Sequence, residues 1–427
     1  MERLFRVASG IDVHRDTLVV TVRRSDGGRE KTQTKTFETF HDDVVRMVAW
    51  MVECGVQVVA LESTGVFWKP VVRALQLGWL GALWLVNPLH VKRVPGRKTD
   101  VTDSQWLSKL AMYGLVSPSY LASPEQEQLR LLTRHRVRLV GDKTRWVNRT
   151  IKELQAAGIK LDTVCSRPLG KSGREMLEAI LEGKLAPDQI AELARGRLRS
   201  KLSNIKRAVQ GSFSESSKLV LRQCLRQIDA MDALIADIDA EIVVHLNKDL
   251  EVVARLCEIP GIEQTAAAAI VAEMGADMSM FDSAKHLASW AGLSPGSNES
   301  AGKRKNSPAR KGDKYLRRII VQCAVTASKT KNTFWKTKFG RLLRLGKKKA
   351  YVAIGRKLLT CIYHMLSTGQ RYVEPVLPPP STRQRERDIK LHTDRLRALG
   401  FDVSLTPKPA ADPQKPQENP NVMGSVS

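Results

Sequence analysis

Four carboxylates stand at positions where they could hold metal ions. Asp12 closes the first predicted strand, Glu62 closes a later apolar strand, and Asp100 and Asp103 open the helix that follows. Carboxylates gathered at one place repel one another unless cations neutralise them, and oxygen ligands suit Mg²⁺ or Mn²⁺. Two such ions about 4 Å apart can stabilise the entering and leaving oxygens of a phosphodiester displacement. Each acid taken singly could instead shape a turn or cap a helix.

The elements that would position these acids lie in a predicted first domain, residues 1–120. Two β-rich runs, 4–13 and 17–24, predict a hairpin, and a third run, 34–40, could pair beside them. The pattern then predicts, in order, a helix at 41–54, a strand at 57–62, a helix at 66–77, a strand at 82–86 and a helix at 101–113. This order predicts a mixed sheet flanked by helices, as in ribonuclease H-like folds. The ends of its parallel strands converge on one edge.

Two long helices are predicted in a second domain, residues 121–250. They cover about 125–158 and 216–246, and residues 160–215 between them predict short helices with a basic patch. Apolar residues of the second helix are spaced by alternating threes and fours: Leu221, Leu225, Ile228, Met231, Ile235, Ile238 and Ile242. This spacing is a coiled-coil seam. The two helices could pair as an antiparallel arm, provide a dimer contact or belong to an ordinary bundle.

A third domain, residues 251–374, is predicted to be mostly helical. Residues 256–275 place a Pro-Gly turn between two helical runs, which resembles a helix-hairpin-helix that presents backbone N–H groups to a phosphate. Such turns are also common without a ligand. The tail, residues 375–427, is rich in proline, and its composition predicts much disorder.

Positive charge is concentrated in the third domain. The 427-residue chain has 69 Lys and Arg against 44 Asp and Glu, a formal charge of +25, and between Lys303 and Lys349 the only acid is Asp313. Such a basic stretch favours a nucleic acid over a solvated face or an acidic membrane, because cations on phosphates release condensed counterions. The residues predicted to contact nucleic acid are Lys303, Arg304, Lys305, Arg310, Lys311, Lys314, Arg317 and Arg318.

Composition argues against several other classes of protein. The chain is 42% hydrophobic, as globular proteins are, and has no apolar stretch of the roughly 20 residues that would span a bilayer. The N-terminus lacks a secretory pattern. The six cysteines are widely separated, without a CxxC pair, and are predicted to be reduced thiols in a cytosolic protein. We therefore expect a cytoplasmic protein with no membrane partner.

Three short motifs resemble those of a known family. The segments GIDVHRD, ALESTG and KTDVTDSQWL resemble the acidic motifs of DEDD transposases of insertion sequences, whose N-terminal domain is similar to the Holliday-junction resolvase RuvC. In the third domain, IPGIEQTAAAAIVAEMG, FDSAKHLASWAGLSP and ESAGKRKNSPARKGDKYLRR resemble the C-terminal domain of that family, in the same order. The resemblance covers roughly residues 7–370. It implies a prokaryotic, nucleoid-associated recombinase of a mobile element.

The resemblance also implies a serine nucleophile. The family's SGGK-like stretch matches Ser300, Ala301, Gly302 and Lys303, where Ala301 departs from the more usual glycine. This departure, together with an extra proline nearby, leaves Ser294, Ser297 and Ser307 as alternative nucleophiles. A serine attacks phosphorus only when its proton and developing charge are managed, which the carboxylates with Mg²⁺ or Mn²⁺ would do. The product would be a covalent DNA-phosphoserine intermediate.

The implied partners are donor and target DNA and a guide noncoding RNA encoded beside the gene. Synapsis of two duplexes leads us to expect a homodimer or tetramer. Three rival functions use the same residues differently. A metal-dependent junction endonuclease would use the acids and water without Ser300, a conventional transposase would transfer strands without a covalent adduct, and a nonenzymatic nucleic-acid-binding protein would need only the basic region.

Overall fold

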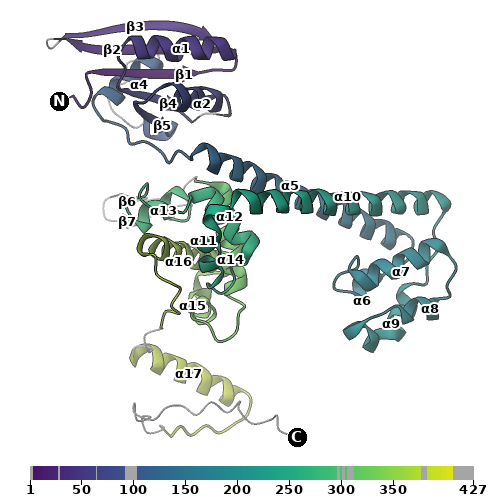
Figure 1. Cartoon of the computed structure of the whole chain (residues 1–427). Helices are drawn as coiled ribbons and strands as arrows, with labels where there is room; N and C mark the ends of the chain where they lie inside the picture. Colours follow the sequence, from purple (N-terminus) through teal and green to yellow (C-terminus); the bar gives the residue numbers. More distant parts are fainter. Residues whose placement is uncertain are drawn as a thin grey trace, which may run out of the picture. The chain divides into compact units, whose positions relative to one another are not determined.

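The computed structural model describes residues 3–26, 29–63, 65–91, 103–295, 299–300, 303–304, 312–376 and 382–406 (Figure 1). The chain divides into two compact units, one up to Val373 and one from Glu374. Among the helices of these ranges, none combines the length and the apolar character that a bilayer crossing requires.

A five-stranded mixed sheet with the order β3-β2-β1-β4-β5 forms the N-terminal part. Its strands are β1 (Val7–Val13), β2 (Thr17–Asp26), β3 (Arg29–Glu38), β4 (Val58–Glu62) and β5 (Ala82–Val86). The first three pair antiparallel, whereas β1, β4 and β5 run parallel. The predicted mixed sheet is confirmed, although β3 begins earlier than the predicted run.

Side-chain alternation gives this sheet two apolar faces. Ile11 and Leu61 pack with helices α1 (His41–Glu53) and α2 (Trp68–Gly78) on one face. Ala8, Val58 and Ala60 pack on the other face with α4 (Asp103–Met112). The short helix α3 (Pro88–Val91) follows β5. Successive residues of a strand point to opposite faces, so Gly10 and Asp12 share the α4 face with Ala8.

Gly10 lets α4 lie directly on β1. A Cβ atom at Gly10 would lie 2.1 Å from the Ser104 carbonyl oxygen and 2.4 Å from the Ser108 nitrogen. Because both are backbone atoms, no side-chain rotation could relieve the clash. The first turn of α4 is therefore held against the strand that carries Asp12.

We expect Gly10→Ala to lower the free energy of unfolding by at least about 3 kcal/mol, because the helix backbone must shift to admit a methyl group. Chemical denaturation measures the change. The matched control is Gly141→Ala in α5, where an added Cβ meets nothing within 4 Å. That control should raise stability by roughly 0.5–1 kcal/mol, since alanine is the better helix former. Equal effects of the two substitutions would contradict the close-approach argument.

A polar network fixes α4 along the sheet. Arg23 of β2 donates to Ser108 Oγ at 3.2 Å and to the Gln105 carbonyl at 3.3 Å, and binds Glu30 of β3 at 2.6 Å. Burial alone would raise the pKa of Glu30, but hydrogen bonds from Tyr113 and Arg23 hold that pKa below its ordinary value of 4.5. The ionised Glu30 thus stabilises the seat of α4.

This lowered pKa makes the stability of the sheet domain depend on pH. Glu30→Gln should cost about 1 kcal/mol at pH 7, allowing for solvent screening of a partly exposed pair. The contribution of Glu30 is present above its unfolded pKa and is lost as the pH falls through its lowered folded pKa. The two proteins should therefore converge in stability as the pH falls below 4.5. Urea denaturation over a pH series measures this, and a difference that does not change with pH would contradict it.

Two long helices, α5 (Pro124–Ala156) and α10 (Glu215–His245), pair side by side as an arm (Figure 1). The ion pairs Arg136–Asp239 and Lys143–Asp232 show that they run antiparallel. Leu221, Leu225 and Ile228 of the predicted seam are buried. They lie in a core shared with Leu154 of α5 and with the helices that connect the two. Because α5 and α10 contact each other along the arm, the structure favours the antiparallel arm among the three alternatives.

A small helical group connects the two arm helices and shares a hydrophobic core with them. It comprises α6 (Leu161–Val164), α7 (Lys171–Glu182), α8 (Pro187–Glu192), η1 (Gly196–Lys201) and α9 (Leu202–Ala208). Several bases of its basic patch pair with acids, for example Arg195 with Glu175 at 2.9 Å and Arg199 with Glu192 at 3.1 Å. The patch is thus partly neutralised by nearby acids.

The remaining core is helical. Its helices are η2 (Asn247–Asp249), α11 (Leu250–Cys257), α12 (Gln264–Met274), α13 (Ala284–Trp290), α14 (Lys314–Ala327), α15 (Phe334–Leu342), η3 (Leu343–Leu345) and α16 (Lys347–Thr368). The Pro-Gly turn between α11 and α12 packs against α14, since a Cβ on Gly261 would lie 2.5 Å from the Ala327 nitrogen. The predicted turn between two helices is therefore present and has a packing role, and its contact with a phosphate stays a prediction.

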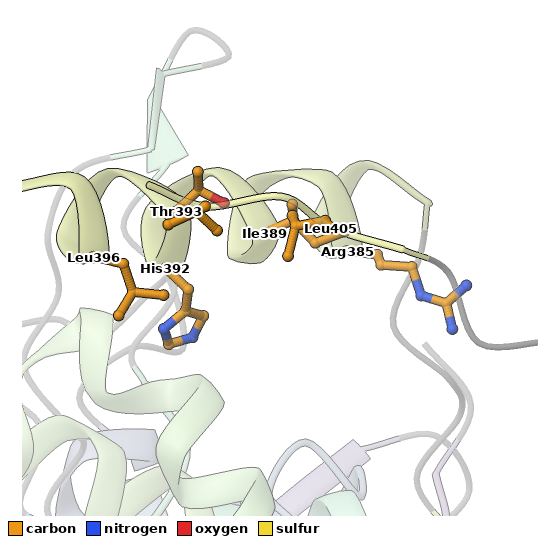
Figure 2. A pocket seen from close by; sticks show the side chains of 7 residues that line it. Arg385, Ile389, His392, Thr393, Leu396 and Leu405 are labelled. Atoms are coloured by element: carbon orange, nitrogen blue, oxygen red, sulfur yellow. The ribbon is translucent and has the colours of Figure 1, made fainter. Parts of the chain in front are cut away.

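The C-terminal unit contains a helix that the composition of the tail did not predict. Helix α17 (Thr382–Ala398) packs its apolar residues Ile389 and Leu396 toward Val403 and Leu405 of the chain that follows it. Figure 2 shows this shallow hollow, with His392 and Arg385 at its border.

Candidate metal edge and serine segment

Asp12 and Glu62 lie at matching positions on neighbouring parallel strands. Ile11 pairs with Leu61, so the next residue of each strand is the acid. Both follow residues that face α1 and α2, and both therefore point toward the α4 face. Neighbouring strands are about 4.8 Å apart, which brings these two carboxylates close at the carboxyl ends of β1 and β4.

Asp103 reaches the same edge from the helix. It is the first residue of α4, and the next residue, Ser104, lies on Gly10. Ser104 Oγ also lies 2.9 Å from Thr21 Oγ1 on β2. Asp12 is two residues beyond Gly10, about 7 Å along the strand. We call Asp12, Glu62 and Asp103 the acidic edge.

The acidic edge is not a closed ion site. Asp100, the fourth predicted ligand, lies outside the described residues. Within the ranges that are described, no three His, Cys, Asp or Glu side chains stand close enough together to hold a metal. The oxygen donors nevertheless match Mg²⁺ or Mn²⁺ in kind, since such ions take carboxylates and complete their shells with water and substrate phosphates.

Sequence reasoning missed His14. Its Nε2 atom lies 3.2 Å from Asp12 Oδ2, and the two side chains are 60% and 28% exposed. The signal was available, because residues two apart in an extended chain share a face. A histidine here can orient the Asp12 carboxylate.

Ser300 lies in a short hairpin. Strand β6 (Glu299–Ser300) pairs antiparallel with β7 (Lys303–Arg304), and Ser300 is opposite Lys303. The pairing leaves two residues between the strands, Ala301 and Gly302, which is the commonest length of a hairpin connection. For Ser300, Lys303 and Arg304 the structure describes the strands but not the side chains. Ser297 and Ser307 lie outside the described residues. Ser294 is half-buried.

The two ends of the chain segment that contains Ser300 are held together. Gly312 lies so close to Gly292 that an added Cβ would be 2.3 Å from the Gly292 nitrogen, and the Asp313 N–H donates to the Trp290 carbonyl at 3.0 Å. We call residues 293–311 the serine segment. Its two ends leave and rejoin the helical core at one point.

The basic surface follows the serine segment. Residues 314–373 contain 15 Lys and Arg and no Asp or Glu. Lys314 and Arg318 of α14 are exposed, and Arg317 is half-buried. Lys305, Arg310 and Lys311 lie outside the described residues. The aromatic residues among these cations serve the core, since Trp335 is 1% exposed and donates to the Tyr372 hydroxyl at 2.9 Å.

Comparisons with known proteins agree with this arrangement. The model of the DEDD transposases of IS110 type matches residues 9–159, and that of the transposase IS116/IS110/IS902 family matches residues 253–339. The first match contains the acidic edge, and the second contains the serine segment. The two models match separate parts of the chain in the order that the sequence motifs predicted.

Three known proteins are similar to this chain over different fractions of its length. The chain is 26% identical to the uncharacterized 42 kDa protein of insertion element IS900 of Mycobacterium paratuberculosis, over 63% of this chain and 71% of that one. It is 23% identical to the transposase for insertion sequence element IS1111A of Coxiella burnetii, over 67% and 72%. It is 34% identical to the pilin gene-inverting protein of Moraxella bovis, over 27% and 37%.

The similar stretches span between 37% and 72% of the relatives' own lengths. The two family matches occupy both ends of the folded core, and each contains residues that the motifs singled out. With the mixed sheet and the helical C-terminal region in place, they establish that this chain belongs to the IS110 family of DEDD transposases.

Proposed function

We propose that this chain excises and inserts its own element by site-specific recombination, through a covalent bond between Ser300 and DNA. The observation that carries the proposal is the acidic edge, where Gly10 seats the first residues of α4 beside Asp12 and Glu62. The oxygen donors of the acidic edge suit the divalent metal that the family uses.

The reaction begins with transfer of a DNA phosphoryl group to serine. The Ser300 oxygen attacks phosphorus, a serine–phosphorus bond forms, the bond to the leaving sugar oxygen breaks, and that oxygen takes up a proton. The proton of Ser300 passes to a carboxylate of the acidic edge, here proposed to be Asp12, acting as general base. Mg²⁺ or Mn²⁺ held by Asp12, Glu62, Asp100 and Asp103 would neutralise charge on the phosphate. The covalent ester conserves the bond for rejoining.

The cations after Ser300 have a clear role in this scheme. Lys303 lies opposite Ser300 in the hairpin, and Arg304 follows it. With Lys305, Arg310, Lys311, Lys314, Arg317 and Arg318 they would bind the scissile and flanking phosphates of donor and target DNA. Phosphate contacts fix register without reading sequence, so another component has to select the target.

That component is, in our proposal, a guide noncoding RNA encoded beside the gene. Base pairing would then read sequence, while the protein reads backbone and shape. Synapsis of two duplexes requires two or four copies of the chain. Because α5 already pairs with α10, a contact between copies would use a different surface of the arm.

The decisive experiment traps the intermediate. Wild-type protein, end-labelled DNA containing the element end, and Mg²⁺ are incubated and resolved on a denaturing gel. A slow-migrating species that protease converts to a short labelled fragment supports the proposal. Cleavage without an adduct would indicate an endonuclease, strand transfer without an adduct a conventional transposase, and binding alone a nonenzymatic protein.

RNA guidance is tested separately. Transcripts of the DNA on both sides of the gene are added to the same reaction, and recombination is scored on matched and mismatched targets. We expect one transcript to bind the protein and to restrict recombination to targets that pair with it. Recombination that is indifferent to every transcript would contradict this part of the proposal.

A further inference from the structure

A buried ion network connects the arm to the serine segment. Glu273 of α12 is 1% exposed, and its carboxylate accepts hydrogen bonds from Arg134 of α5 at 2.8 and 2.6 Å. Arg134 Nη2 also lies 3.4 Å from Asp313 Oδ2, and the guanidinium lies 4.2 Å from the centre of the Tyr315 ring. A planar guanidinium with these partners is held in one orientation.

Asp313 passes this constraint to the backbone. Its Oδ1 atom accepts from the N–H groups of Tyr315 and Leu316 at 2.9 and 2.7 Å, which caps α14. Its own N–H holds the Trp290 carbonyl, and Gly312 before it lies against Gly292. Arg134 therefore contacts the residue at which the chain re-enters the core after the serine segment.

Burying charged groups between helices costs free energy. Burial raises the pKa of Glu273, against the opposing influence of the Arg134 guanidinium. Arg130 reinforces the site by donating to the Ala272 carbonyl at 3.1 Å. Apolar residues of similar volume often stabilise a core as well as a buried ion pair does. We therefore infer that the directional contacts of Arg134 with Glu273 and Asp313 fix the relative positions of the segments that carry them.

We propose that Arg134 is a positioning residue for strand transfer. Through Glu273 and Asp313, it fixes the end of the serine segment relative to α5. The inference rests on the proposed function, since it concerns the presentation of Ser300.

The test compares two identical substitutions in one helix. Arg134→Lys keeps the charge but cannot bind a carboxylate as a planar fork. Its rate of adduct formation at saturating DNA should fall about 100-fold, because small misplacements of reacting groups have effects of that size. The Kd for DNA and the Tm should change little. Arg136→Lys is the control, since Arg136 binds both carboxylate oxygens of Asp239 on α10. Equal rates in the two variants would overturn the proposal.

A double substitution separates positioning from stability. Arg134→Met with Glu273→Met fills the same space without charge, and such replacements are often neutral or stabilising. We expect a Tm at or above that of the wild-type protein and an adduct rate as low as that of Arg134→Lys. A restored rate would show that the network only stabilises the core, and would overturn the proposal.

Amide hydrogen exchange distinguishes failure of this inference from failure of the proposed function. Exchange at Tyr315 and Leu316 should be faster in Arg134→Lys than in Arg136→Lys, because Asp313 loses its partner. Faster exchange supports the coupling between Arg134 and Asp313 whether or not the protein forms an adduct. Absence of an adduct in the wild-type protein would overturn only the serine mechanism. Equal exchange in both variants would overturn the coupling.

Discussion

Replacing Ser300 by alanine is expected to abolish the covalent protein-DNA adduct and the rejoining of strands. The hydroxyl is the proposed nucleophile, and removal of a nucleophile lowers turnover by about 10⁴-fold or more in enzymes that act through one. DNA binding should persist, since the 15 Lys and Arg of residues 314–373 remain. A denaturing gel measures the adduct, and a mobility-shift titration measures binding.

The competing serines supply the controls. Ser294→Ala, Ser297→Ala and Ser307→Ala should each keep the adduct, although Ser294 is half-buried beside Leu293 and its loss could lower stability slightly. An adduct that survives in Ser300→Ala but disappears in one of these would move the nucleophile to that residue. Cleavage that survives without any adduct would instead assign the attack to water.

Local patterns were enough to predict the sheet. The apolar and β-branched residues of β1, β2 and β4 mark these segments as strands, and the pairing of β1 with β2 follows from the short turn between them. The seat of α4 could not be predicted in the same way. It depends on Gly10 meeting Ser104, residues that are far apart in the sequence and carry no mutual signal.

The helical core shows the same limit. Glu273 stands in the alanine-rich run of α12, and its partner Arg134 is 139 residues away. Nothing near either residue marks the pair. The Pro-Gly turn at Gly261 was predictable from its local sequence, but its contact with Ala327 of α14 was not, because the two residues are far apart in the sequence. The composition of the tail likewise did not predict α17, because the apolar residues of this helix are few and widely spaced.

Replacing Asp12 by asparagine is expected to remove metal-dependent strand cleavage. Asparagine keeps the size of the side chain but loses the charge that holds a divalent cation and, in the proposed scheme, accepts the serine proton. We expect Mn²⁺ affinity to fall at least about 100-fold and the rate of adduct formation to fall about 10³-fold or more. Calorimetric titration with Mn²⁺ measures the first quantity and the denaturing gel the second. Removal of metal from wild-type protein with EDTA should reproduce the loss, and added Mg²⁺ should reverse it.

Asp16→Asn is the matched control, because Asp16 lies in the turn that follows β1 but is 74% exposed and pairs with Arg15 at 2.9 Å. It should leave both metal affinity and adduct formation unchanged. If Asp12→Asn binds Mn²⁺ as tightly as Asp16→Asn does, the acidic edge is not the metal site, since Asp12 lies at its centre between β2 and β4. If affinity falls in Asp12→Asn while the adduct still forms at the wild-type rate, metal is bound there but is not used in the attack by serine.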